Sequence, residues 1–364
     1  MRWITAILAA LLCAAPTLAQ AQGFTCPQIV ETALAAADEF CAGVGRNQAC
    51  YGNVKLDAEL RPAASDTRFQ VAGDLVNVVH LETLRLSPMD VTVGEWGVAV
   101  MKLQANLPDT LPGQNVTFLL FGDVEIQNAV AEDDDVLRPM QAFILRTGAK
   151  DAACDQAPES GLLVQTPAGA GQIALSVNGV EVQMGSTVFF QAGGEDGLAI
   201  STLEGIAQAT VQGESQIIVP GTWISIPISA DLRPVGPPGL PSSYEGRVRM
   251  LNALPLRLLE RKIEVAPPLT PEQLERLLAR LAAGVPPCGD DLLPCDRLEG
   301  LRGDTCILCP LAYPTPTPHR PAPPRIQLTP TPPPPPPPPP GASGGDDGSS
   351  DDRNDDDGDD NDDD

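Results

Sequence analysis

Cysteine has the widest chemistry of the residue types in this 364-residue chain, because a thiol can form disulfides, bind metals or carry redox reactions. Nine cysteines occur, and Cys13 lies in an apolar N-terminal run typical of a cleaved secretory signal, residues 1–22. The eight that remain are Cys26, Cys41, Cys50, Cys154, Cys288, Cys295, Cys306 and Cys309. An even count in an exported chain predicts disulfides, two among the early four and two among the late four, with connectivity left open.

Zinc binding and redox chemistry are the alternatives for the late cysteines. Cys306 and Cys309 have the CxxC spacing, but six residues separate Cys288 from Cys295, so a second such pair is missing. A redox CxxC opens a helix within a βαβ unit, which the surrounding pattern does not indicate. We therefore favour disulfides and predict neither a metal site nor a cofactor site.

The other residue types that serve enzymes are poorly placed. Of the two histidines, His80 lies in a strand pattern and His319 in a Pro-rich stretch. Residues 341–345 spell GxSxG without the strand and helix that a nucleophile elbow needs, and residues 169–174 spell GxGxxA before a strand instead of a helix. No catalytic nucleophile or phosphate-binding loop is indicated.

Carboxylates are abundant, and the adjacent pair Glu195 and Asp196 has the chemistry of acid/base hydrolysis if its spacing in three dimensions is suitable. Sugar-binding sites commonly use aromatic platforms, whereas Trp96 and Trp223 both lie in strand patterns and are predicted to pack in a core. In the acidic tail, Arg353 occupies the first liganding position of an EF-type loop, so only weak cation association is expected. We expect no catalysis.

Charge and hydropathy restrict the partners. The formal net charge is -25, and residues 346–364 contain 12 Asp and one Arg. Such a chain lacks the cationic surface that phosphate backbones require, so no nucleic-acid partner is expected. Once the signal is cleaved, no remaining segment is long and apolar enough to predict a membrane span.

Hydrophobic periodicity predicts a mainly β protein with short helices near both ends. Apolar residues at helical spacing indicate a helix over 27–40, and alternation with period two begins near Phe69. The clearest signal is a hairpin, in which Asn178-Gly179 turns between alternating runs at 173–177 and 180–184. Short strands at near ten-residue spacing continue to Ile228, as expected for an antiparallel sandwich or β-roll.

A second helix is predicted after the strands. Thr270-Pro271-Glu272-Gln273 forms a capping box with proline at the first helical position, and a leucine stripe expected to cover its own domain ends before Gly284. A shorter helix is predicted over 257–262. Nine consecutive prolines, 332–340, predict a polyproline rod, and the Asp-rich residues beyond it predict disorder.

These signals divide the chain into six segments. They are a signal peptide at 1–22, an N-terminal helix and β region at 23–150, a β domain at 151–232, a helical and Cys-rich region at 233–309, a Pro-rich linker at 310–345 and an Asp-rich disordered tail at 346–364. The pattern leaves open whether the two β regions share one sheet.

The β domain resembles the extracytoplasmic β-domain of the FecR-like family over about residues 172–228. Three segments carry the resemblance: 180–188 (VEVQMGSTV), 200–207 (ISTLEGIA) and 217–226 (IIVPGTWISI). The resemblance implies a bacterial, envelope-facing sensing or scaffolding module. The early cysteines and residues 46–53 also look like the opening of uncharacterised exported proteins of Chloroflexota-type bacteria.

The sequence therefore predicts a secreted or cell-envelope protein that binds an envelope protein or a cell-wall polymer without catalysis. The alternative is a soluble extracytoplasmic sensor or regulator that docks on a membrane partner. FecR-like regulators of sigma factors carry a cytoplasmic segment and a membrane span before the β-domain, and here a cleavable signal is predicted in their place.

Overall fold

A computed structural model of the protein describes residues 23–64, 66–104, 115–130, 139–148, 154–167, 172–285 and 287. The predicted signal, the late cysteines, the Pro-rich linker and the Asp-rich tail lie outside these residues, so the predictions about them stay predictions. All described residues belong to one compact unit. Its fold is mainly β, as predicted.

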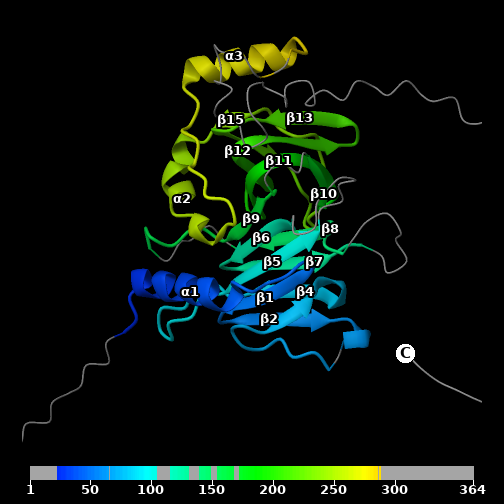
Figure 1. The fold of residues 1–364 in the computed structure, drawn as a ribbon. Helices are drawn as coiled ribbons and strands as arrows, with labels where there is room; N and C mark the ends of the chain where they lie inside the picture. The colour runs from blue at the N-terminus through cyan, green and yellow to red at the C-terminus, as the bar shows by residue number, and fades with distance from the viewer. Residues whose placement is uncertain are drawn as a thin grey trace, which may run out of the picture. The chain divides into compact units, whose positions relative to one another are not determined.

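The strands of the described residues form one continuous, strongly curled sheet (Figure 1). They are β1 (Gln48–Asn53), β2 (Leu56–Leu60), β3 (Leu75–Asn77), β4 (Leu81–Leu86), β5 (Val98–Gln104), β6 (Asn115–Phe121), β7 (Val124–Asn128), β8 (Ala142–Thr147), β9 (Gly161–Gln165), β10 (Ile173–Val177), β11 (Val180–Ala192), β12 (Leu198–Val211), β13 (Glu214–Ile218), β14 (Thr222–Ile226) and β15 (Ser242–Ser243). The α-helices are α1 (Cys26–Cys41), α2 (Val248–Asn252) and α3 (Pro271–Ala282). All strand pairs are antiparallel except β8 with β10.

The long hairpin of β11 and β12 divides this sheet into two wings. Because β12 follows one side of β11 along its length, β10 and β9 lie one after the other on its second side. Through β10 the first wing continues as β8, β7, β4 and β2, and through β9 the second wing continues as β6, β5, β1 and β3. The expected boundary at residues 150 and 151 thus falls between strands that pair with each other, β6 with β9 and β8 with β10.

The hairpin changes wing at a β-bulge. Thr187 pairs with Glu204 and Val188 with Thr202, so Leu203 is the extra residue. Gly205 next to it has φ +70°, and a Cβ there would overlap the carbonyl oxygen of Gly185. Bulges bend a strand and raise its twist, and glycine permits both the positive φ and the close backbone approach. This corner allows one hairpin to serve both wings.

The two wings enclose a shared core. One buried cluster takes side chains from both, such as Leu84 of the first wing and Met101 of the second. A second cluster covers the outer face of the second wing with α1 and residues 244–265. In β6, Phe118 points to the first cluster and Leu119 to the second, so this strand is buried on both sides.

Two disulfides fasten α1, one to β1 of the second wing and the other to the segment that precedes β9. Cys41 bonds to Cys50 of β1, with 5.7 Å between their Cα atoms, and Cys26 bonds to Cys154, with 6.1 Å between theirs. The prediction of two bridges among the early cysteines is confirmed. The helix is not closed on itself by Cys26 and Cys41, since each of these cysteines has its partner outside α1.

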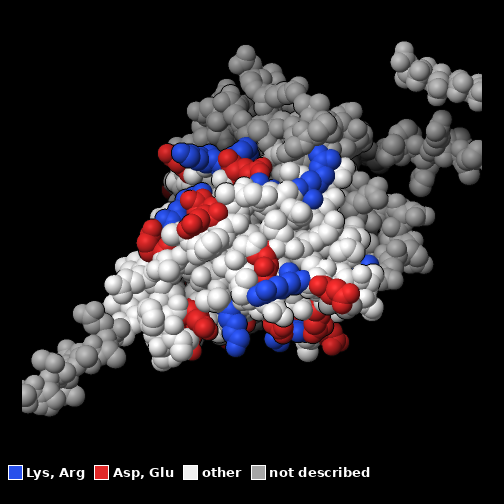
Figure 2. Space-filling view, turned by 60° about the horizontal axis from the view of Figure 1, so that its bottom comes forward, with Lys and Arg blue, Asp and Glu red and all other residues white. Residues whose placement is uncertain are grey.

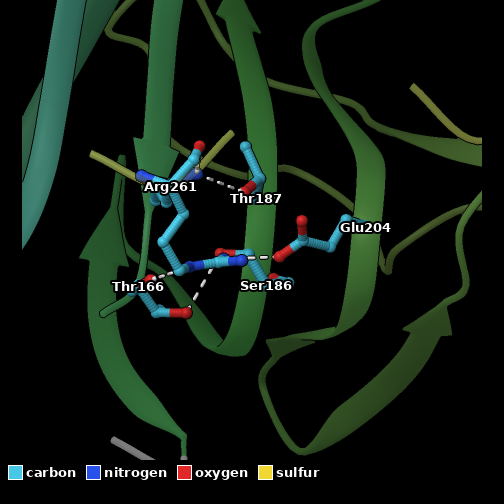
Figure 3. Close-up of polar contacts among 6 residues, drawn as sticks. Thr166, Ser186, Thr187, Glu204 and Arg261 are labelled. Carbon is cyan, nitrogen blue, oxygen red and sulfur yellow. Dashed lines mark hydrogen bonds and ion pairs between the residues drawn. The ribbon is translucent and has the colours of Figure 1, made fainter. Parts of the chain in front are cut away.

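A polar brace holds the corner of the hairpin (Figure 3). Arg261, from the segment that covers the second wing, pairs with Glu204 and donates through Nε to the Thr166 carbonyl, 3.2 Å away. The backbone N–H of Arg261 donates to Gln165 Oε1 at 2.8 Å, and its backbone carbonyl accepts from Gln165 Nε2 at 3.0 Å. Segments distant in sequence are thereby tied to the point where β11 and β12 bend.

Most of the predicted local elements are confirmed, with two corrections. Asn178 (φ 57°) and Gly179 (φ 86°) form the predicted turn, and the Thr270 capping box opens α3. The helix predicted over 257–262 is wrong, because only a 3-10 turn at Leu256–Leu258 forms there and the true helix, α2, precedes it. His80 lies in the 3-10 turn Val78–His80, just before β4, and not in a strand.

Candidate binding site at the β11–β12 turn

The predicted acidic pair, Glu195 and Asp196, lies in the turn that joins β11 to β12. This turn borders a hollow of about 290 Å³, which we call the turn hollow. Its lining residues are Thr147, Gly148, Gln191, Gly193, Gly194, Glu195, Asp196, Gly197 and Ala199. The sequence singled out the two carboxylates, but it gave no sign of the end of β8 that faces them.

Glycines and a threonine determine the shape of the turn. Gly193 (φ 134°) lies so close to β8 that a Cβ would be 2.9 Å from the Thr147 carbonyl oxygen. Gly197 (φ 66°) approaches Ile226 of β14 even more closely. The Thr147 hydroxyl bonds to both backbone groups of Ala192, at 3.1 and 3.2 Å, which joins the end of β8 to the start of the turn.

Asp196 is held by a cation that also stacks on an aromatic ring. Arg247 Nη2 lies 2.7 Å from Asp196 Oδ2, and its guanidinium carbon lies 3.9 Å from the centre of the Trp223 ring. The Arg247 side chain is 14% exposed, so this contact is only weakly screened by water. Trp223 is half-buried and packs against the outer cluster. Trp96 is fully buried, as predicted.

Gln191 contributes the most buried polar group of the turn hollow. The residue is 5% exposed, and Nε2 donates to Glu159 Oε2 at 3.1 Å and to the Ser160 carbonyl at 3.2 Å. The Oε1 atom is buried and accepts no hydrogen bond. Glu195 and Asp196 also line the turn hollow, so its side-chain polar groups are mainly hydrogen-bond acceptors.

This acceptor-rich chemistry favours ligands that donate hydrogen bonds. Carboxylates and amide oxygens bind ammonium, guanidinium and amide groups, and net negative charge attracts cations. Glu195 is exposed at the rim, where it is accessible to such a ligand. Asp196, in contrast, is engaged by Arg247, so its charge is largely compensated.

Within the described ranges, no group of three metal-ligating side chains comes together, and no helix is long and apolar enough to cross a membrane. Sequence reasoning missed Gln191, Arg247 and Thr147. Glutamine and threonine in strand patterns carry no distinctive spacing, and Arg247 follows Trp223 by more than twenty residues. Only the glycines around Glu195 and Asp196 marked this place as a turn.

Comparisons with known proteins add one distant structural likeness. No protein family matches the chain, and no curated protein is detectably similar to it in sequence. A solved structure named as a candidate anti-sigma factor from Parabacteroides distasonis is similar over 40% of this chain and 60% of its own, with 10% identity and a TM-score of 0.25. The alignment thus spans less than two thirds of that chain.

Proposed function

We propose that this protein is an exported, non-catalytic binding or scaffolding protein of the bacterial cell envelope or exterior, built on a FecR-like β-domain, with the turn hollow as its binding site. The turn hollow carries the proposal because open space, a rigidly shaped backbone and acceptor groups coincide there. The disulfides Cys26–Cys154 and Cys41–Cys50 support export, since such bonds persist in oxidising compartments.

The chemistry of the turn hollow supports a partner that presents donors. Ammonium or amide groups of an envelope protein, or of a peptide-bearing wall polymer, match the exposed Glu195 carboxylate of the turn hollow. Arg247 and Trp223 hold the acidic turn in place before the partner arrives. Little ordering of the turn is then required on binding, which favours affinity.

Capture from native envelope and medium tests this function with two matched lysine variants. Gly194 and Gly213 both have positive φ, 66° and 89°, and both have open space where a Cβ would be. Gly194 lines the turn hollow, whereas Gly213 lies in the β12–β13 turn. Gly194→Lys adds a cation to the turn hollow, and Gly213→Lys adds the same cation elsewhere at similar conformational cost.

We expect the mature chain, residues 23–364, and Gly213→Lys to retain the same discrete partner, and Gly194→Lys to retain at least five-fold less. Equal capture by both variants would contradict the proposed site. A membrane receptor as the captured partner would favour the regulatory alternative over scaffolding. Capture that disappears only when residues 310–364 are removed would assign binding to the tail instead.

A further inference from the structure

Strand β2 lies at the free edge of the first wing and has backbone groups without partners. Among the described residues it pairs only with β4, and Ser87 N–H donates to the Lys55 carbonyl at 3.0 Å. In an antiparallel ladder, hydrogen-bonded positions alternate, so Asp57 and Glu59 bond to β4 while Leu56 and Ala58 point the other way. Tyr51 Oη takes the Leu56 N–H at 2.9 Å. Within the part of the chain that the structure describes, the N–H and C=O of Ala58 have no partner on the free edge.

A second hollow follows this edge. It has a volume of about 400 Å³ and is lined by Leu56, Asp57, Ala58, Leu60, Thr67, Phe69 and Gln70. The residues at 67–70 form the opposite wall without pairing with β2. Phe69 is buried against Tyr51, with 5.5 Å between ring centres, so this wall has an apolar anchor. We call this space the edge slot.

Charge at the edge slot is set by the outer face of the first wing. Glu59, Arg85, Glu125 and Arg146 form a row of ion pairs across four strands, at 2.6, 3.1 and 3.7 Å. Figure 2 shows such mixing of positive and negative side chains on one face of the molecule. Asp57 borders the edge slot, is exposed, and forms no ion pair with the described residues. Its charge favours a basic partner.

We propose that the edge slot binds an extended peptide, as an added strand beside β2, in which apolar residues alternate with basic ones. An added strand supplies the acceptor and donor that Ala58 lacks, which is the usual mode of peptide recognition by an open sheet edge. Side chains of a strand alternate between faces. Apolar residues of the peptide then face Phe69 and Leu60, and basic residues face Asp57. This surface is separate from the turn hollow.

Titration with the peptide Lys-Val-Lys-Val-Lys, blocked at both ends, tests the proposal on the mature chain. We expect saturating peptide to slow hydrogen exchange of the Ala58 amide at least ten-fold, with little change at Asp57 and Glu59, whose amides are already bonded. The same peptide with N-methylated valines keeps its charge but loses donors, and it is expected to bind at least ten-fold more weakly.

Two variants block the edge slot from opposite walls. Ala58→Pro removes a backbone N–H that β4 does not use, and Thr67→Trp fills the space from an exposed position. We expect each to weaken peptide binding at least ten-fold, and Thr67→Trp provides the test if Ala58→Pro folds poorly. Unchanged Ala58 exchange at millimolar peptide, or equal binding by Thr67→Trp, would overturn the proposal. So would protection of Ala58 that rises with protein concentration without peptide, because a second copy would then occupy the edge.

Discussion

The guanidinium of Arg247 lies 3.9 Å above the centre of the Trp223 ring and thereby holds Asp196 beside the turn hollow. A planar guanidinium stacks on an indole while it donates to a carboxylate, and an ammonium does not reproduce both contacts. Arg247→Lys is therefore expected to lower the free energy of unfolding by about 1 kcal/mol and to speed amide exchange in the turn. Urea denaturation measures the first effect.

Arg249→Lys is the matched control for this prediction. Arg249 pairs with Asp155 at 3.2 Å, but the two side chains are 83% and 71% exposed. Exposed pairs contribute little, so we expect a change below about 0.5 kcal/mol. If the two lysine variants unfold at the same urea concentration, the stacked contact does not stabilise the turn.

The brace at the hairpin corner predicts strong coupling between Glu204 and Arg261. Their side chains are only 16% and 22% exposed. Arg261 also donates to the side-chain oxygen of Gln165 and to the backbone carbonyl of Thr166. A double-mutant cycle of Glu204→Gln and Arg261→Met is expected to give a coupling energy of about 1 to 2 kcal/mol. The exposed pair of Arg257 and Glu31, 3.1 Å apart, should give less than about 0.5 kcal/mol. Equal coupling in the two pairs would argue against the brace.

The corner itself predicts a large difference between two glycine substitutions. Gly205→Ala combines a positive φ with overlap of the Gly185 carbonyl oxygen, and we expect a loss of about 3 kcal/mol or failure to fold. Gly213→Ala has a positive φ of 89° but open space, so about 1 kcal/mol is expected. Thermal or urea unfolding of both variants checks this order. Similar losses would mean that close backbone approach does not define the corner.

The two disulfides close loops of very different length. Cys26 and Cys154 are separated by 128 residues, and Cys41 and Cys50 by 9. The chain-entropy relation predicts that replacing the first pair by serine costs about 5 kcal/mol and the second about 3 kcal/mol. Denaturation of both double variants tests this. A free-thiol assay should find none of these four cysteines reactive in the wild type, and reactive thiols there would contradict the pairing.

Asp74 predicts a loss of stability in acid near the edge slot. Its carboxylate accepts the backbone N–H groups of Gln70 and Val71, at 2.8 and 3.0 Å, and these hydrogen bonds hold its pKa below the usual 3.8. A lowered folded-state pKa stabilises the fold above pH 3.8, and this contribution disappears as the pH falls through the folded-state value. Asp74→Asn should therefore lose less stability than the wild type between pH 5 and about pH 3. Parallel stability curves would contradict this.

Local chemistry was sufficient to predict some elements from sequence. Asn178-Gly179 specifies its turn because both residues tolerate positive φ, and Thr270 to Gln273 specify the start of α3 through bonds within one helical turn. His80 was misplaced because an apolar run such as Val78-Val79 fits a strand or a 3-10 turn equally well. β6 is buried at every residue, its polar Asn115 and Thr117 included, because it faces two cores, and strict alternation could not reveal this.

The candidate site was less predictable because its contacts are distant in sequence. Asp196 and Arg247 are 51 positions apart in the sequence, and Cys26 and Cys154 are 128 apart. The hydrophobic pattern of the sequence identified the strands on each side of residue 150. It could not reveal that β6 pairs with β9, because this pairing depends on the bend of the β11–β12 hairpin at its bulge.

Hydrogen exchange of the mature chain, with and without the partner captured from native envelope, tests the central claim most directly. The proposed function predicts that the partner slows exchange in residues 191–197, around the turn hollow, while the β12–β13 turn at Gly213 is unchanged. Protection confined to other segments, with residues 191–197 exchanging at their free rate, would contradict the assignment of binding to this site.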